Sequence, residues 1–352
     1  MPWQTNVRTV TPYVAGEQPR QANIIKLNTN ESPYPPGPAV ARALAALSAD
    51  DLRRYPDPDC DALTQTLADY HGLSPEQVFV GVGSDDVLAL AFLTFFNGPE
   101  PILFPDISYS FYDVWANLYR IPFRTPALDE DFRIVKADYL SANGGIIFPN
   151  PNAPTGILEG LDLVEDIVRA NDDSVVIIDE AYIDFGGESA LPLIKQYDNL
   201  LVVRTFSKSR ALAGLRIGYA MGQAGLIKYL KDAKFATNSY TMNTPSLALG
   251  VAAIKDEAYF KETRAKIIRT RAWFAKELGA LGFSFPEPMA NFIFATHEKI
   301  PAAYIFADLR EMGIYVRHWQ RPRIDNYLRI TIGSDEEMRV LIDNLRSILE
   351  SD

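Results

Sequence analysis

The sequence has very little cysteine and histidine. Cys60 is the only cysteine, which excludes an intramolecular disulfide and a zinc site built on several cysteines. The three histidines, His71, His297 and His318, lie far apart without the spacing of metal ligands, so we predict no metal site. The most apolar stretch, residues 87–96, is much shorter than the roughly 20 apolar residues that a membrane-spanning helix needs.

The chain also lacks an excess of basic residues. Its formal net charge is −11, which argues against nucleic acid or an anionic membrane as the main partner. An acidic protein can still bind an anionic substrate where arginines gather locally. The segment Met1 to Val14 has no basic patch followed by an apolar run, so we expect no export signal and a cytoplasmic protein.

The order of apolar and polar stretches predicts two kinds of structure along the chain. Residues 1–36 are rich in Pro, Asn, Thr and Tyr and predict an extended arm. Between residues 62 and 221 predicted helices alternate with short strands, and several strands are continuous apolar runs, which is typical of strands buried on both faces. This pattern predicts an α/β domain with a largely parallel sheet.

After about residue 250 a long amphipathic stretch, residues 257–281, precedes short strands and helices that predict a smaller α+β domain. We therefore expect residues 1–44 to form the arm and part of the small domain. Residues 45–250 would form the large domain and residues 251–352 the small one.

Lys208 follows a predicted buried strand, within the segment Val203-Arg-Thr-Phe-Ser-Lys-Ser-Arg. A lysine amine held at the edge of a sheet can form an imine with a carbonyl group of a cofactor. Arg216, eight residues further on, can bind a phosphate as a fork, and Thr205 and Ser207 supply hydroxyl donors. Taken alone, a lysine after a strand is more often an ordinary surface residue.

Asp179 ends another predicted buried strand, Val175 to Ile178, at the position where open α/β sheets bind ligands. A carboxylate there can keep the ring nitrogen of pyridoxal 5'-phosphate (PLP) protonated. Tyr182, three residues on, could reach the ring hydroxyl. An aspartate that merely caps a turn is the alternative.

Gly83, Ser84 and Asp85 form a glycine turn between a predicted strand and an apolar helix. Backbone N–H groups at the start of such a helix bind anions, so this turn suits the phosphate of the cofactor. A short glycine turn is weak support by itself, because many tight turns have the same composition.

In this order and at these spacings the motifs resemble those of the histidinol-phosphate aminotransferase family, which belongs to the class II aminotransferases and to the fold-type I PLP-dependent transferases. The similar stretches cover nearly the whole chain. They are residues 7–13, 27–31, 54–56, 102–112, 151–156, 179–185, 205–216 and 328–333.

The resemblance implies further roles. Tyr109 would stack on the ring of PLP, and Tyr55 would reach the cofactor phosphate of the partner subunit, which implies a homodimer with shared active sites. Arg329 and Arg317 would bind the anionic group of the substrate. Tyr13 and Asn30 would lie on the substrate side of the arm, and each of these residues has an ordinary structural alternative.

One position departs from the family. An asparagine normally contacts the ring hydroxyl, and Ala153 stands at that position here. Either Asn152 replaces it or Tyr182 and water serve the hydroxyl.

The resemblance implies an aminotransferase in which Lys208, Asp179 and Tyr182 are catalytic. The expected reaction converts histidinol phosphate and 2-oxoglutarate to imidazole-acetol phosphate and glutamate in histidine biosynthesis. Three alternatives stay open on the sequence: a threonine-phosphate decarboxylase, an aromatic or general amino-acid aminotransferase of the same fold, and a binding protein that retains PLP without turnover.

Overall fold

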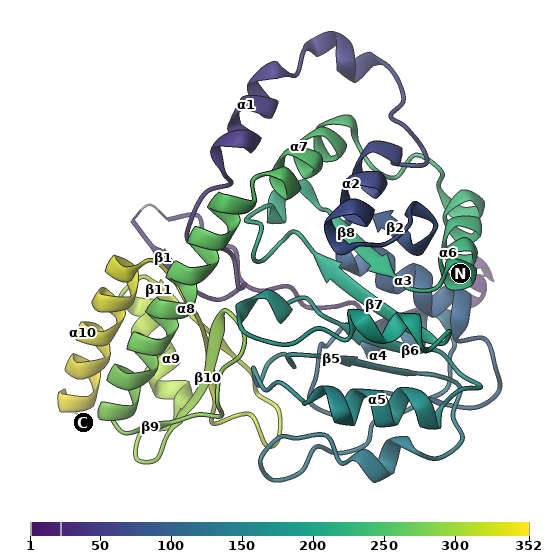
Figure 1. Cartoon of the computed structure of the whole chain (residues 1–352). Coiled ribbons are helices and arrows are strands. Elements are labelled where there is room, and N and C mark those ends of the chain that lie inside the picture. The colour runs from purple at the N-terminus through teal and green to yellow at the C-terminus, as the bar shows by residue number, and fades with distance from the viewer. Residues whose placement is uncertain (1, 22, 352) are drawn as a thin grey trace.

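The computed structural model describes residues 2–21 and 23–351. Within them, the largest sheet has seven strands in the order β2-β8-β7-β6-β5-β3-β4 (Figure 1). These strands are β2 (Val78–Gly81), β3 (Ile102–Leu103), β4 (Phe123–Arg124), β5 (Ile146–Pro149), β6 (Val176–Asp179), β7 (Leu200–Thr205) and β8 (Gly218–Met221). From β4 to β7 neighbouring strands are parallel, whereas β8 is antiparallel to β7 and β2. The predicted α/β fold with a mostly parallel central sheet is confirmed.

Helices cover both faces of this sheet. Along β6, Val176 and Ile178 pack in one apolar core and Ile177 packs in the other, on the opposite face. The first core includes α2 (Asp61–His71), α5 (Leu161–Ala170) and α7 (Thr244–Lys255). The second includes α3 (Gly83–Phe95), α4 (Tyr112–Tyr119) and α6 (Ala224–Thr237). Burial on both faces explains why the strands are continuous apolar runs.

The C-terminal region surrounds a second core. Among the described residues it holds a four-stranded sheet in the order β12-β13-β10-β9. Its elements are α8 (Glu257–Ala280), β9 (Phe283–Ser284), β10 (Phe292–His297), α9 (Ala302–Glu311), β12 (Arg317–His318), β13 (Leu328–Thr331) and α10 (Asp335–Ser351). Close to this sheet, β1 (Ile25–Lys26) pairs in parallel with β11 (Ile314–Tyr315). The domain limits at residues 44 and 250 remain predictions.

Some boundaries differ from the predictions. The helix expected from Ser108 begins at Tyr112, because Asp106 Oδ1 accepts hydrogen bonds from the N–H groups of Ile107 and Leu128 and fixes the preceding residues as a loop. The arm contains a 3-10 helix, Pro2–Asn6, and the strand β1.

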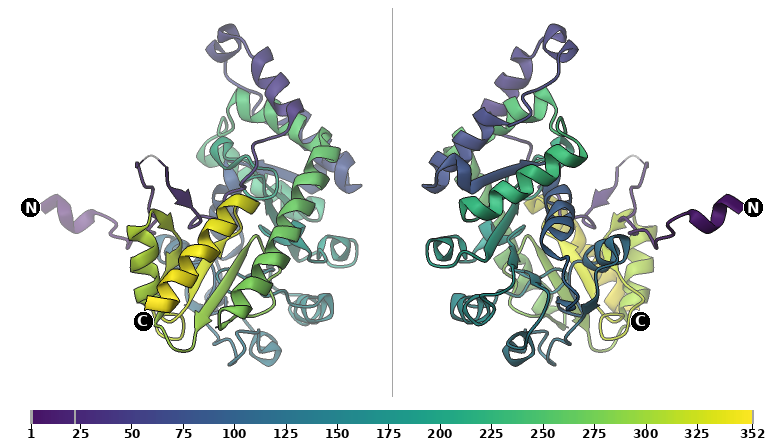
Figure 2. Two further views of the ribbon diagram at one scale, coloured as in Figure 1. Left: turned by 90° about the vertical axis from the view of Figure 1, so that its left-hand side faces the viewer. Right: turned by 90° about the vertical axis from the view of Figure 1, so that its right-hand side faces the viewer.

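Two helices extend the outline of the molecule. The helix Pro2–Asn6 projects from the body (Figure 2). The helix α1 (Pro38–Ala46) lies at the top of Figure 1 and packs against α7. No helix in the described ranges is long and apolar enough to cross a membrane.

Candidate active site

A cavity of about 220 Å³ lies at the carboxyl ends of β6 and β7. It brings together most of the residues that the sequence predicted for the cofactor. Those that line it are Ser84, Asp85, Tyr109, Asp179, Tyr182, Thr205, Ser207, Lys208 and Arg216. Because parallel strands end at the same edge of a sheet, residues separated by more than a hundred positions converge there.

Lys208 follows β7 and points into this cavity. Its Nζ donates a hydrogen bond to the carbonyl oxygen of Thr29, 3.1 Å away, and lies 5.7 Å from the centre of the Tyr182 ring. Among the described residues no carboxylate lies within 4.0 Å of this amine. The amine is therefore available to a carbonyl compound that enters the cavity.

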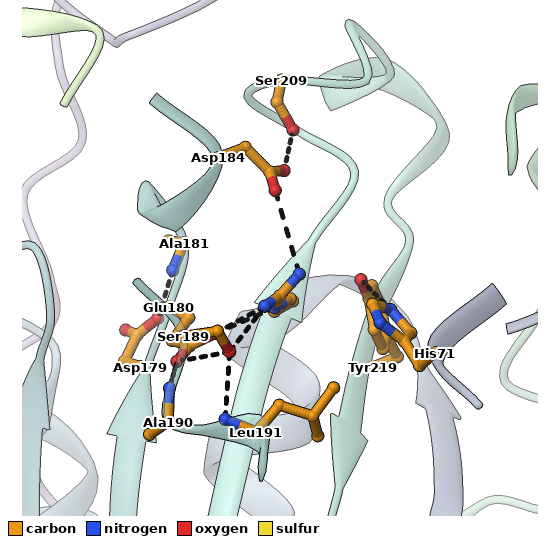
Figure 3. Close-up of polar contacts among 11 residues, drawn as sticks. His71, Asp179, Glu180, Ala181, Asp184, Ser189, Ala190, Leu191, Ser209 and Tyr219 are labelled. Carbon is orange, nitrogen blue, oxygen red and sulfur yellow. Dashed lines mark hydrogen bonds and ion pairs between the residues drawn. The ribbon is translucent and has the colours of Figure 1, made fainter. Parts of the chain in front are cut away.

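Asp179 ends β6 and is almost completely buried. Its Oδ2 accepts a hydrogen bond from the hydroxyl of Tyr112 at 3.0 Å. Its Oδ1 accepts one from the Ala181 N–H at 3.2 Å (Figure 3). Burial raises the pKa of Asp179 to about 6, although the hydrogen bond from Tyr112 opposes this shift. A positively charged ligand group would relieve the cost of the buried charge.

The opposite end of the cavity forms a cradle for an anion. Arg216 Nη2 lies 2.9 Å from Asp85 Oδ2, and Nη1 donates to Ser207 Oγ at 3.4 Å. Gly83 has φ +83°, and a Cβ there would lie 2.6 Å from Arg216 Nη2. A Cβ on Gly218 would lie 2.2 Å from the backbone of Gly83. Gly83 is required by its positive φ and Gly218 by its close approach to backbone, and together they let the start of α3 and the guanidinium face the same volume.

Two tyrosines border the cavity. The hydroxyl of Tyr109 donates to Asp85 Oδ1 at 2.8 Å, so Asp85 holds both Tyr109 and Arg216. The hydroxyl of Tyr182 accepts a hydrogen bond from Asn30 Nδ2 at 2.9 Å. The side chain of Asn30 is itself fixed by Thr331, whose hydroxyl donates to Asn30 Oδ1 at 3.0 Å. The arm thereby reaches the cofactor side of the site.

Three residues predicted for the cofactor do not line this cavity: Asn152, Tyr55 and Gly83, which lies directly behind Arg216. Asn152 Nδ2 donates to the Ile107 carbonyl oxygen and to Thr155 Oγ1, each at 3.0 Å, while Ala153 lines the wall. Tyr55 is 82% exposed, and its ring centre lies 4.7 Å from that of Tyr240 on the outer surface. A role for Tyr55 in a partner subunit stays a prediction.

A second cavity of about 290 Å³ shares Tyr109 and Ala153 with the first. Three predicted substrate residues line it: Tyr13, Arg317 and Arg329. The ring of Tyr13 is stacked on Phe111, with 4.4 Å between the ring centres.

Arg317 donates to the carbonyl oxygens of Val14 and Ala15, and Arg329 donates to that of Asn28. Arg329 Nε is buried and has no hydrogen-bond partner. Burial lowers the pKa of Arg329, and the charge of Arg317 acts in the same direction. Three arginines, Arg317, Arg321 and Arg329, and one carboxylate, Asp113, line the cavity. Within the described residues neither Arg317 nor Arg329 forms an ion pair, which suits an anionic ligand.

The sequence did not indicate three further residues of the two sites. Trp319 and Arg321 line the second cavity, and their spacing from Arg317 on alternate positions was the available signal. Tyr112 reaches Asp179 from α4, and no local pattern marks that contact between residues 67 positions apart.

A buried polar network around Glu180 and Ser189 lies beside the ends of β6 and β7 (Figure 3). Arg204 donates from Nε to Glu180 Oε2 at 2.9 Å, and Glu180 also accepts hydrogen bonds from Ser189 and the Ala190 N–H. Burial raises the pKa of Glu180, and the charge of Arg204 opposes this shift. This ion pair joins the strand ends that carry Asp179 and Lys208.

Comparisons with known proteins agree with this geometry. Residues 22–345 match the model of the family described as aminotransferase class I and II, so the chain belongs to that family. It is 52% identical over 347 residues to a histidinol-phosphate aminotransferase of Clostridium botulinum (strain Langeland), covering 99% of this chain and 98% of that one. It is 50% identical over 350 residues to the histidinol-phosphate aminotransferase of Lactococcus lactis (strain IL1403), covering 99% and 97%.

The fold is likewise shared with a solved structure. The histidinol-phosphate aminotransferase of Sinorhizobium meliloti in complex with pyridoxal-5'-phosphate superposes with a TM-score of 0.84. The two sequences are 26% identical, and the match covers 93% of this chain and 91% of that chain. The resemblance stated from the motifs and the fold-type I assignment are confirmed.

Proposed function

We propose that this chain is a PLP-dependent aminotransferase that transfers the amino group of histidinol phosphate to 2-oxoglutarate, giving imidazole-acetol phosphate and glutamate. The observation that supports this substrate is the second cavity, where Arg317 and Arg329 lie next to the cavity of Lys208 and, among the described residues, form no ion pair. Guanidinium groups accept a phosphate monoester or a carboxylate as forks, so one pocket can serve both substrates.

The residues of the first cavity fit PLP. The buried carboxylate of Asp179, with its raised pKa, suits a protonated ring nitrogen. Arg216, the hydroxyls of Thr205 and Ser207, and the N–H groups at the start of α3 would hold the phosphate. Tyr109 would pack against the ring, and Tyr182 would reach its hydroxyl. Asn152 remains a weaker candidate for that hydroxyl, because its amide donors already bind Ile107 and Thr155.

The first cavity would hold the cofactor and the proton-transfer group, and the second would orient the substrate. When bound, PLP supplies an electron sink conjugated to the substrate nitrogen. The amine of Lys208 would act as a positioned general base and acid that moves a proton between the substrate Cα and carbon C4′ of the cofactor. Asp179 would keep the ring nitrogen protonated, and Arg317, Arg329 and Tyr13 would orient the substrate through its anionic group. Asn30 supports this arrangement through Tyr182.

The steady-state comparison of substrates tests this proposal. We expect kcat/KM for histidinol phosphate, with 2-oxoglutarate as acceptor and glutamate as the detected product, to exceed that for phenylalanine or tyrosine. Carbon dioxide released from threonine phosphate would instead identify a decarboxylase. Bound PLP without turnover of any donor would leave only the binding-protein alternative.

The proposal includes a homodimer with shared active sites and a cytoplasmic location. The exposed aromatic rings of Tyr55 and Tyr240 support an interface at this surface. Mixing inactive Tyr55→Ala and Lys208→Ala proteins should restore activity, because a hybrid dimer contains one intact site if Tyr55 acts in the partner. Subunit exchange followed by mass spectrometry is the control. Exchange without recovered activity would contradict a role across the interface.

A further inference from the structure

Arg317 and Arg329 stand directly opposite each other on the antiparallel strands β12 and β13. Like charges in this cross-strand position destabilise a sheet. Among the described residues neither arginine forms an ion pair, and their acceptors are backbone carbonyl oxygens of the arm. Something other than a negative charge must therefore help to hold the two guanidinium groups together.

Trp319 occupies the position that can do this. Its ring centre lies 5.5 Å from Arg317 Cζ and 5.3 Å from Arg329 Cζ. A cation near an indole ring is attracted by the electron density of the ring face, and the attraction grows where water is excluded. One aromatic ring thus stabilises both cations and adds no charge to the cavity.

The strand pattern explains why the indole faces the arginines. Trp319 follows Arg317 by two residues, so both lie on the same side of the extended segment, whereas His318 between them lies beside Phe306. Trp319 also packs against an apolar cluster that includes Ile107 and Ile324. The ring is anchored on one side and lines the substrate cavity on the other.

A carboxylate in the place of Trp319 would hold the arginines equally well but would neutralise them. The indole leaves their full charge for the ligand. A phosphate monoester carries more negative charge than a carboxylate and more acceptor oxygens, so it benefits most from two guanidinium groups at a fixed separation.

We propose that Trp319 is a specificity-determining residue, which positions Arg317 and Arg329 so that the cavity favours a phosphate monoester over a carboxylate. The inference rests on the proposed function, because it names the residue that selects between the two substrates of the same pocket.

The test compares Trp319→Leu and Trp319→Phe with the wild-type holoenzyme. Trp273→Phe is the matched control, because Trp273 packs in the core of the C-terminal region away from both cavities. We expect Trp319→Leu to lower kcat/KM for histidinol phosphate by about tenfold or more, and to change that for 2-oxoglutarate by about threefold or less. Trp319→Phe keeps a weaker aromatic face and should lose less.

A binding measurement separates this role from general packing. In the holoenzyme the cofactor phosphate fills the cradle of Arg216, so inorganic phosphate reports on the second cavity, and glutarate serves as an unreactive dicarboxylate. Calorimetry should show a dissociation constant for phosphate raised about tenfold in Trp319→Leu and a much smaller change for glutarate. The cofactor absorbance of each variant verifies that the first cavity is intact.

Equal losses for phosphate and glutarate, or an unchanged phosphate affinity, would overturn the inference. If Trp319→Leu does not fold, Trp319→Phe gives the same comparison with a smaller effect. A wild-type enzyme that binds phosphate but does not turn over histidinol phosphate would refute the proposed function alone, while the binding comparison would still decide the role of Trp319.

Discussion

The two cavities of the site are built in different ways. The cofactor cavity is lined mainly by residues that follow the strands of one sheet, such as Asp179 and Lys208. The substrate cavity is assembled from more segments, which are the arm at residues 11–14, the residues around Tyr109, residues 153–154, β12 with the loop that follows it, and β13. A sheet with both faces buried fixes its residues firmly, whereas a wall made of loops and an arm can change without loss of the fold.

The two cavities also differ in whether their arginines are paired with carboxylates. Arg216 is paired with Asp85 in the first cavity, but Arg317 and Arg329 have only carbonyl acceptors in the second. The first cavity is thus ordered before any ligand binds. The second keeps its positive charge for the substrate. This difference predicts that variants of the first cavity abolish chemistry or alter stability, and that variants of the second alter affinity and specificity.

The largest effect is expected at Lys208. Lys208→Ala should lower turnover by about 10⁴-fold, because the variant loses both the cofactor linkage and the proton-transfer group. Borohydride reduction of the wild-type holoenzyme should fix the cofactor to the peptide that contains Lys208, as peptide mass spectrometry would show. Lys195→Ala, at an exposed position, should react like the wild type. Labelling of the same peptide in Lys208→Ala would contradict the assignment.

The buried ion pair of Glu180 and Arg204 joins the strands β6 and β7, whose ends form the first cavity, and its contribution to stability can be tested. Glu180→Ala should lower the free energy of unfolding by about 3–5 kcal/mol, because it removes the nearer carboxylate from the buried Arg204 and leaves only Asp184 Oδ1, 3.8 Å away. Urea unfolding of the cofactor-free protein measures this.

Two controls accompany that experiment. Asp166→Ala, which breaks more exposed pairs with Lys136 and Arg169, should cost less than about 1 kcal/mol. The double variant Glu180→Leu with Arg204→Met should be more stable than Glu180→Ala. A double variant no better than the single one would show that packing, not the unpaired charge, causes the loss.

The ionised carboxylate of Asp179 suits a ligand in the first cavity, but we expect it to lower the free energy of unfolding of the cofactor-free protein. The folded protein favours the neutral carboxyl, since its pKa rises from 3.8 to about 6. This group therefore destabilises the cofactor-free protein progressively as the pH rises from about 4 to about 6. At pH 7 Asp179→Asn should stabilise that protein by up to about 3 kcal/mol, while lowering turnover of the holoenzyme.

Unfolding measured at pH 4 and pH 7 checks the sign of this effect. The gain from Asp179→Asn should fall below about 1 kcal/mol at pH 4, because the carboxyl is protonated in the folded state there and only partly ionised in the unfolded state, where its pKa is 3.8. A gain that is equal at the two pH values would mean that the ionisation of Asp179 does not cause it.

The smallest of these effects is expected in the second cavity. Arg329→Ala should lower kcat/KM for both substrates by roughly 10- to 100-fold, because each charge-assisted hydrogen bond contributes about 1.5–3 kcal/mol. Arg317→Ala should impair histidinol phosphate more than 2-oxoglutarate. Stability should change little. Arg339→Ala, on the exposed side of α10, is the control. Losses within about threefold for both substrates would make these arginines ordinary surface charges.

The contrast between the cavities also explains what the sequence could predict. Lys208, Asp179 and Gly83 each follow an apolar run that marks a strand, so local pattern alone indicated their place at the edge of the sheet. The hydrogen bond from Tyr112 to Asp179 and the approach of Trp319 to Arg329 depend on packing between distant segments. Periodicity tells which face a residue occupies but not which remote residue it meets.

Only the family resemblance predicted a role for Arg317 and Arg329, because neither arginine follows a long apolar strand. The orientation of Asn152 was likewise beyond local pattern. Its amide binds the carbonyl oxygen of Ile107, which is 45 residues away. The antiparallel placement of β8 between β2 and β7 is a further case, since parallel and antiparallel strands of a buried sheet have similar composition.

The pairing of β1 with β11 has a consequence for how the chain is made. Ile25 pairs with Ile314, and Asn30 accepts a hydrogen bond from Thr331 in addition to its contact with Tyr182, so both residues have partners some 300 positions later in the chain. During synthesis the large sheet can form before the partners of residues 23–36 in the C-terminal region have been made. The substrate cavity is therefore completed only after β13 has left the ribosome. A nascent chain that ends before β11 would contain Asp179 and Lys208 of the cofactor cavity but would lack Arg317 and Arg329.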